Sequence, residues 1–365
     1  MVSNYADRLT QAIHDKNNPS VAGYDPRVEY TPNHILNAAV RRYGKTPKAD
    51  GDFLREYFTL LTETIADVVP ALKLNAAFFE QFGPEGLAAM KYISDHAKEF
   101  GLVRVADAKR NDIGSTAEAY AKTWIGKVKH AWGGSSPSMD FDAVTVNPYL
   151  GRDGIDPFID AAKLFGNGIY VLCRTSNKSA VETQDSLTDL EGWQVEMMNR
   201  LGGVDVMGEI EKLPEETREA AKAKFAWLDQ QGEITRAPEY IKMATLIDMW
   251  GEDVVGDCGY SSVGAVVGAT YPVEAMILRA LLPQTPFLVP GYGAQGGGAA
   301  GVVPAFDKDG NGAIVNNSRA LTYACRSGEF EPERFHHAAA EAAGLMRFDI
   351  TEALRDAGKG KWGRK

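Results

Sequence analysis

The side chains best suited to chemistry lie at the end of one apolar run, in residues 102–116. Successive side chains of a strand point to opposite faces, so Asp107 and Lys109 are expected to share one face. Asp112 follows three residues later. A lysine between two carboxylates can place a negative charge beside a substrate carboxylate and a cation beside a carbon that gains negative charge. Such a pair can also be a weak surface salt bridge, and spacing alone favours that simpler interpretation.

Other apolar runs also end in single polar residues, which favours a functional cluster over a surface salt bridge. These residues are Asp25, Lys73, Asn75, Asn147 and Ser176. In a barrel of parallel strands the carboxyl ends meet at one rim, where active sites of that fold lie. We therefore expect these side chains to gather around Asp107 and Lys109.

A second stretch could hold an anion. Residues 290–298 contain five glycines, and Arg319 follows further along the chain. Glycines let backbone N–H groups approach an anion closely, and the planar guanidinium of an arginine suits a phosphate. The glycines alone could equally form a flexible loop, but together with Arg319 they indicate a phosphate site at the common position of this fold.

The elements that position these residues alternate between strand and helix. Strands are expected near 21–23, 72–75, 102–107, 143–147, 168–176, 265–270, 287–291 and 313–317. Ser115 and Glu118 have the spacing of a capping box, which predicts that a helix begins there, leaving Asp112 on the loop before it. Eight alternations predict one (β/α)₈ TIM barrel domain over residues 1–365.

Two further segments are expected outside the regular barrel. Residues 204–240 are predicted to be a surface insertion, in which the charged stretch 209–230 forms a helix with a solvated face. Residues 335–357 are predicted to form an extra C-terminal helix that packs on the barrel.

The motifs together resemble those of orotidine 5′-phosphate decarboxylases, in particular the longer, bacterial-type branch. Residues 107–112 match the Asp-x-Lys-x-x-Asp signature of that family. Further matching segments occur in the family's order, at 23–26, 73–80, 144–151, 174–177, 267–270 and 290–297. The resemblance implies decarboxylation of orotidine monophosphate (OMP) to uridine monophosphate (UMP) in pyrimidine biosynthesis, with no cofactor and no metal.

The resemblance also implies a role for each charged residue. Lys109 would stabilise the carbanion at C6 of the pyrimidine and then protonate it. Asp107 would lie against the departing carboxylate, and Lys73 would neutralise and orient Asp107. Asp112 would complete an alternating array of charges.

The same resemblance implies a set of substrate-binding residues. They are Asp25, Asn75, Thr116, Ser176, Gly293, Gln295 and Arg319. Asp25 and Lys73 would bind ribose hydroxyls, Ser176 would bind the base, and Gln295 and Arg319 would bind the phosphate. In this family Asp112 and Thr116 are presented to a partner's active site, so a homodimer with shared sites is expected.

Composition narrows the possible functions further. The net charge of −10 argues against binding to nucleic acid or to a membrane surface. The three cysteines are widely spaced and the six histidines are scattered, so neither a disulfide framework nor a metal site is indicated. No apolar run approaches the length of a membrane span, and we expect a cytoplasmic enzyme.

Two alternatives from other functional classes remain open. A magnesium-dependent sugar-phosphate enzyme of the same superfamily, such as a hexulose-phosphate synthase or a keto-gulonate-phosphate decarboxylase, shares the Asp-x-Lys-x-x-Asp motif. A non-catalytic barrel that only binds a phosphate ligand is the other. A pure binding protein would gain nothing from placing Asp107 against a substrate carboxylate.

Overall fold

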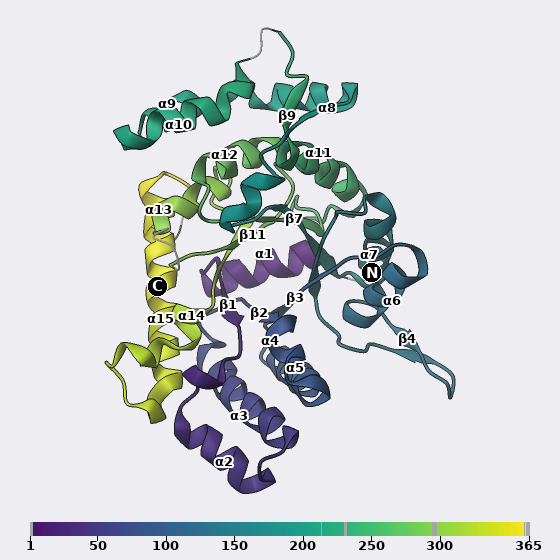
Figure 1. The fold of residues 1–365 in the computed structure, drawn as a ribbon, viewed down its shortest axis with the longest axis vertical. Coiled ribbons are helices and arrows are strands. Elements are labelled where there is room, and N and C mark those ends of the chain that lie inside the picture. Colours follow the sequence, from purple (N-terminus) through teal and green to yellow (C-terminus); the bar gives the residue numbers. More distant parts are fainter. Residues whose placement is uncertain (1–2, 213, 230–231, 294–297, 361, 363–365) are drawn as a thin grey trace.

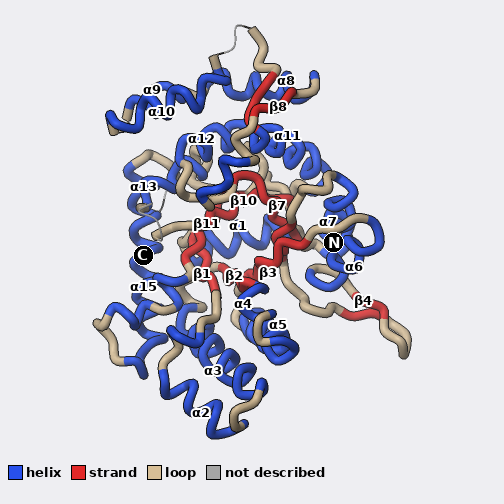
Figure 2. Tube along the Cα trace, viewed as in Figure 1, coloured by secondary structure: helices blue, strands red, loops and turns tan. Residues whose placement is uncertain are grey.

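A closed barrel of eight parallel strands forms the centre of the molecule (Figure 1). The computed structural model describes residues 3–212, 214–229, 232–293, 298–360 and 362. Helices surround this ring of strands (Figure 2). In barrel order the strands are β1 (Ser20–Tyr24), β12 (Ala313–Asn317), β11 (Phe287–Pro290), β10 (Val263–Val267), β7 (Gly168–Arg174), β6 (Ala143–Val146), β3 (Val103–Arg110) and β2 (Ala71–Asn75). The predicted (β/α)₈ fold is therefore confirmed.

The strands are apolar because both of their faces are covered. Every residue of β1, β6, β10 and β12 is buried, as expected for parallel strands with side chains inside the barrel and helices outside it. One predicted strand is displaced: the segment expected at 265–270 is strand β10, which ends at Val267. The chain turns after that residue, so Ala269 and Thr270 belong to the rim.

The outer layer consists of helices that follow the strands. Its main members are α3 (Pro47–Ile65), α5 (Gly83–Glu99), α6 (Gly114–Trp124), α7 (Arg152–Phe165), α11 (Glu239–Gly251), α12 (Pro272–Leu281) and α15 (Phe335–Asp356). Helix α3 buries an apolar stripe of Leu54, Phe58, Leu61 and Ile65. Pro47 at its start has a backbone already suited to a first helical turn. Helix α15 confirms the predicted C-terminal helix.

The first helix closes the amino end of the barrel. Helix α1 (Tyr5–Lys16) crosses behind the ring of strands in Figure 1. The Tyr5 hydroxyl donates to the Tyr170 hydroxyl at 3.1 Å. A Cβ atom on Gly168 would lie 2.3 Å from the Tyr5 ring, so this close approach needs a glycine. With that end closed, the carboxyl ends of the strands form the open rim.

The helix after β3 begins differently from the prediction. Helix α6 begins at Gly114, and Ile113 occupies the cap position without a side-chain cap. Gly114 has φ +53, a conformation that glycine adopts at low cost, so the chain turns there and Ser115 lies inside the first turn instead of capping it. The helix ends at Trp124, and β4 (Val128–Lys129) then pairs antiparallel with β5 (Ser135–Ser136).

The chain leaves the barrel between β7 and α11. This excursion contains η2 (Lys178–Glu182), β8 (Leu187–Asp189), α8 (Gly192–Met197), η3 (Met198–Gly203), α9 (Val206–Glu211), α10 (Glu215–Phe225), η4 (Ala226–Leu228) and β9 (Arg236–Pro238). Strands β8 and β9 pair antiparallel at its base, and α9 and α10 lie at the top of Figure 1. The single helix expected over 209–230 is instead two helices, because Pro214 caps the start of α10.

Within the ranges given above, no helix combines the length and apolar character needed to cross a bilayer.

Candidate active site

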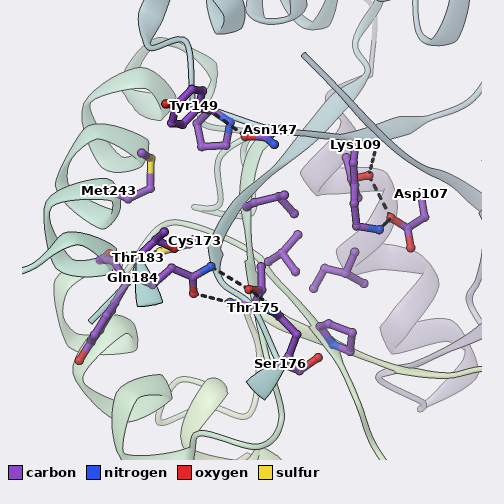
Figure 3. Close-up of a pocket in the computed structure, with 18 of the residues that line it drawn as sticks. Asp107, Lys109, Asn147, Tyr149, Cys173, Thr175, Ser176, Thr183, Gln184 and Met243 are labelled. Atoms are coloured by element: carbon purple, nitrogen blue, oxygen red, sulfur yellow. Dashed lines mark hydrogen bonds and ion pairs between the residues drawn. The ribbon is translucent and has the colours of Figure 1, made fainter. Parts of the chain in front are cut away.

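A cavity of about 820 Å³ opens at the carboxyl ends of the strands. Its lining includes Lys73, Asp107, Lys109, Thr145, Asn147, Tyr149, Thr175, Ser176, Gln184, Tyr240 and Met243. In Figure 3, Asp107 and Lys109 lie on one side, and Thr175, Ser176 and Gln184 on another. The cavity is large enough for a nucleotide-sized ligand.

Three charged side chains are in direct contact on one wall of this cavity. The Lys73 ammonium donates to Asp107 Oδ2 at 2.8 Å, and the Lys109 ammonium contacts Asp107 Oδ1. The side chains of Lys73 and Asp107 are only 4% and 11% exposed, whereas that of Lys109 is 49% exposed. Lys109 therefore presents its charge to the cavity, while Lys73 and Asp107 are held behind it.

The local backbone explains how Asp107 and Lys109 reach each other. The pairing of β3 with β6 shifts between Ala106 and Arg110, and Lys109 has φ +47. A left-handed backbone is uncommon for lysine, and such strained conformations cluster at functional sites. The Lys109 backbone N–H donates to Thr145 Oγ1 at 2.9 Å, and that hydroxyl donates to Asp107 Oδ1 at 3.1 Å. Thr145 thus fixes both residues.

The charges in this cluster stabilise one another. Burial alone would raise the pKa of Asp107, but Lys73 and Lys109 hold that pKa well below its usual range. Burial would lower the pKa of Lys73, yet the carboxylates of Asp107 and Asp25 raise it. Asp107 and Lys73 are therefore both ionised at neutral pH, in a place with little water.

Asp25 and Asn75 lie at the ends of the neighbouring strands. Asp25 directly follows β1, and its Oδ1 atom is buried without a hydrogen-bond partner within the described part of the chain. Asn75 is the last residue of β2 and makes no side-chain cap to α4 (Ala76–Glu80). Buried carboxylate oxygens are normally paired, so Asp25 is suited to accept a hydrogen bond from a ligand.

Ser176 reaches the cavity from the segment after β7. Gly268 makes room for it, since a Cβ atom there would lie 2.9 Å from both the Cα and the Cβ atoms of Ser176. The close packing of these two segments fixes Ser176 at the cavity wall.

The expected phosphate residues follow two adjacent strands. Strands β11 and β12 pair through Pro290 and Asn316. Gly293 follows β11 with φ +75, and Arg319 is exposed at the start of α14 (Arg319–Thr322), directly after β12. Gln295 lies outside the described residues. Gly293 and Arg319 therefore enter the rim from neighbouring strands, as a shared anion site requires.

Asp112 and Thr116 lie beyond the end of β3, on the loop before α6 and in its first turn. Asp112 is half-buried on the loop before α6, where its Oδ1 accepts a hydrogen bond from the Ile113 N–H at 2.8 Å, and Thr116 is exposed. Neither is among the described residues that line the cavity, and the same holds for Asp25, Asn75, Gly293 and Arg319.

Sequence reasoning missed several residues of the cavity. Thr145 carried a signal, because it is a polar residue inside an apolar strand. Gln184 and Met243 carried none, since they come from the excursion and from α11. Within the described residues, no group of three or more His, Cys, Asp and Glu side chains is arranged to hold a metal ion.

Comparison with known proteins identifies the family. Residues 52–327 match the model of the orotidine 5′-phosphate decarboxylase / HUMPS family. The orotidine 5′-phosphate decarboxylase of Rhodopirellula baltica is 34% identical over 330 residues, 89% of this chain and 90% of that protein. The corresponding protein of Caldicellulosiruptor bescii is 32% identical over 328 residues, covering 89% of this chain and 91% of that protein.

Solved structures agree with this assignment. The OMP decarboxylase of Leishmania donovani is 25% identical, with a TM-score of 0.59 over 94% of this chain and 99% of that one. A Toxoplasma gondii chain with 24% identity gives a TM-score of 0.69 over 98% of both chains, which supports the barrel fold. This chain belongs to the orotidine 5′-phosphate decarboxylase family.

Proposed function

We propose that this enzyme decarboxylates OMP to UMP without a cofactor, using Lys73, Asp107 and Lys109. The observation that carries the proposal is the contact of two lysines with one desolvated carboxylate at the strand ends. The uncatalysed reaction has a very high barrier, because the pyrimidine offers no electron sink. An enzyme must supply stabilisation toward the upper end of the ~8–23 kcal/mol range, and preorganised charge can contribute much of it.

The chemical step follows from the positions of the charges. Asp107 is ionised and would lie next to the carboxylate of the bound substrate. Loss of carbon dioxide therefore relieves the repulsion between these two anions. The bond from C6 to the carboxyl carbon breaks, and its electron pair stays on C6. The Lys109 ammonium stabilises that pair and transfers a proton to C6, and solvent then reprotonates the lysine. Lys73 keeps Asp107 charged and in place.

The remaining rim residues suit the rest of the nucleotide. The unpaired oxygen of Asp25, together with Lys73 and Asn75, is suited to ribose hydroxyls. Ser176 faces the cavity where the base would lie. Gly293, Gln295 and Arg319 would hold the phosphate, and binding there would help to exclude water from the charged cluster.

We also propose a homodimer in which Asp112 and Thr116 enter the partner's site. The exposed position of Thr116 in the first turn of α6 supports this arrangement. The neighbouring Ile113 is 50% exposed, as an interface residue would be in a single chain. We further propose a single catalytic domain, with residues 204–240 as a surface insertion, that acts in the cytoplasm and binds neither nucleic acid nor membranes.

The reaction is tested by following OMP and UMP with purified protein in excess EDTA. We expect stoichiometric conversion of OMP to UMP and carbon dioxide at an undiminished rate. Activity that disappears with EDTA and returns with magnesium would instead support a sugar-phosphate enzyme. Binding of OMP without turnover would support the non-catalytic barrel.

The shared site is tested by mixing two nearly inactive variants, Lys109→Ala and Asp112→Ala. A heterodimer has one site with both defects and one site with neither. If subunits pair at random, about half of the dimers are heterodimers, and activity should recover to roughly a quarter of wild type. An inactive mixture in which mass spectrometry detects heterodimers would place Asp112 in the site of its own chain.

A further inference from the structure

A buried charge cluster lies between the barrel and the excursion after β7. Arg174, the last residue of β7, is fully buried, and its Nη2 atom lies 3.0 Å from Asp185 Oδ1 and 3.7 Å from Glu274 Oε1. Lys224 of α10 contacts Glu274 directly and lies 3.6 Å from Asp185. The ring of Tyr271 lies 4.1 Å from the Arg174 guanidinium carbon and 5.0 Å from the Lys224 nitrogen.

The charges of this cluster balance only when Lys224 is present. Glu274 is 5% exposed and Asp185 is 21% exposed, so both carboxylates have lost much of their water. Arg174 supplies one positive charge for the two carboxylates, and Lys224 supplies the second. Removing one partner from a buried ionic group leaves an uncompensated charge, which makes the remaining groups rearrange or take up water.

The cluster is joined to the wall of the catalytic cavity. Arg174 Nη1 donates to Gln184 Oε1 at 3.2 Å, and the Thr175 N–H donates to the same oxygen at 3.0 Å. Gln184 Nε2 in turn donates to Thr175 Oγ1 at 2.7 Å. The Tyr240 backbone N–H donates to the Gln184 backbone oxygen at 3.1 Å. Gln184 and Thr175 both line the cavity beside Ser176 (Figure 3).

We propose that Lys224 is a positioning residue, through which the surface insertion holds the Thr175–Gln184 wall of the active site in place. The path runs from Lys224 through Glu274 and Asp185 to Arg174, and from Arg174 to Gln184. The insertion then has a role in substrate binding, although its helices α9 and α10 supply no residue to the cavity as described.

This inference rests on the proposed function, which also identifies the part of the substrate whose binding depends on Lys224. Ser176 is assigned to the pyrimidine, and Thr175 and Gln184 lie on the same wall. The phosphate residues follow β11 and β12 instead. Disturbing the wall should therefore weaken ligands that carry the base and leave ligands that consist of ribose and phosphate unaffected.

The test compares Lys224→Met with Lys222→Met, a matched change two residues away on the same helix. Lys222 pairs with Glu211 and Glu219 of the insertion, and within the described residues it makes no ion pair with the cluster. The probes are UMP and ribose 5-phosphate, each measured as an inhibitor of OMP decarboxylation by the full-length protein. We expect Lys224→Met to raise the inhibition constant of UMP about tenfold, the scale of one lost hydrogen bond, and to leave that of ribose 5-phosphate within about twofold.

Lys224→Arg should restore most UMP binding, because it keeps the charge, and Lys222→Met should resemble wild type. Equal weakening of both probes by Lys224→Met, or no weakening of either, would overturn the inference. If Lys224→Met does not fold, Lys224→Gln is measured in its place with the same two decisive outcomes. A wild-type protein that neither decarboxylates OMP nor binds UMP would instead contradict the proposed function.

Discussion

Two regions of the molecule use the same residue types with opposite consequences. At the rim, Lys73 and Asp107 are 4% and 11% exposed. On the insertion, Lys222 and Glu211 lie 3.0 Å apart, but they are 36% and 53% exposed. The hydrogen bond with Glu211 raises the pKa of Lys222, yet water screens this exposed pair. At the rim, desolvation makes every charge interaction stronger.

Desolvation of the shared carboxylate, not the presence of an ion pair, marks the catalytic region. The same distinction applies to Lys224, which lies on the same helix as Lys222 but contacts a buried cluster. The two lysines are similarly exposed, at 31% and 36%, and the difference lies in the carboxylate that each contacts: Glu274 is 5% exposed and Glu211 is 53% exposed.

The largest expected effect comes from removing the shared carboxylate at the rim. Asp107→Asn keeps the shape of the side chain but removes the charge that opposes the substrate carboxylate. We expect kcat to fall at least about a thousandfold, which corresponds to ~4 kcal/mol. Steady-state rates with saturating OMP measure this effect. A variant within tenfold of wild type would remove Asp107 from the catalytic step.

A smaller effect is expected at the phosphate end. Arg319→Ala should lower kcat/KM for OMP by about ten- to a hundredfold, since a charge-assisted contact contributes ~1.5–3 kcal/mol. Orotidine, which lacks the phosphate, should be turned over equally by both proteins. Equal losses for the two substrates would place Arg319 away from the phosphate.

The pH dependence of stability distinguishes the rim cluster from a group that titrates near neutrality. The lowered pKa of Asp107 gives a stabilisation that is present above its ordinary value of 3.8 and is lost as pH falls through the lower folded value. The raised pKa of Lys73 gives a stabilisation that is present below 10.5 and is lost as pH rises through the higher folded value.

Between about pH 5 and pH 9 both contributions are complete. The difference in unfolding free energy between wild type and Asp107→Asn should therefore be constant over that range. Urea unfolding at several pH values measures it. A marked slope near pH 7 would show that another group controls the cluster.

The smallest effect is expected for the exposed ion pairs of the insertion. Lys222→Ala and Lys212→Ala remove exposed pairs with Glu211 and Glu209. We expect kcat, KM and the thermal unfolding midpoint to match those of wild type. A clear loss of activity in either variant would show that these exposed charges also act on the site.

Much of the rim was predictable from sequence because strand periodicity and barrel topology act together. Asp25, Lys73 and Asp107 could be brought together because each follows or ends an apolar run, and parallel strands must present those ends on one side. The left-handed backbone of Lys109 and the bridging role of Thr145 depend on the shifted pairing of β3 with β6, which no local pattern encodes.

The insertion was the least predictable part of the structure. Its charges follow a surface pattern, so Lys224 looks like its neighbours in sequence. Its contact with Glu274 spans 50 residues and depends on how α10 lies over α12. Propensity rules describe the helices but not that long-range contact.

The most direct test of the account compares Lys109→Ala with Lys222→Ala in one assay of OMP decarboxylation. Both lysines contact a carboxylate, but only Lys109 presents its charge to the cavity. We expect Lys109→Ala to lose decarboxylation while still binding UMP, because the lost group acts on charge that develops in the transition state. Lys222→Ala should retain the wild-type rate. A Lys109→Ala enzyme within about tenfold of wild type, roughly 1.4 kcal/mol, would contradict the assigned mechanism.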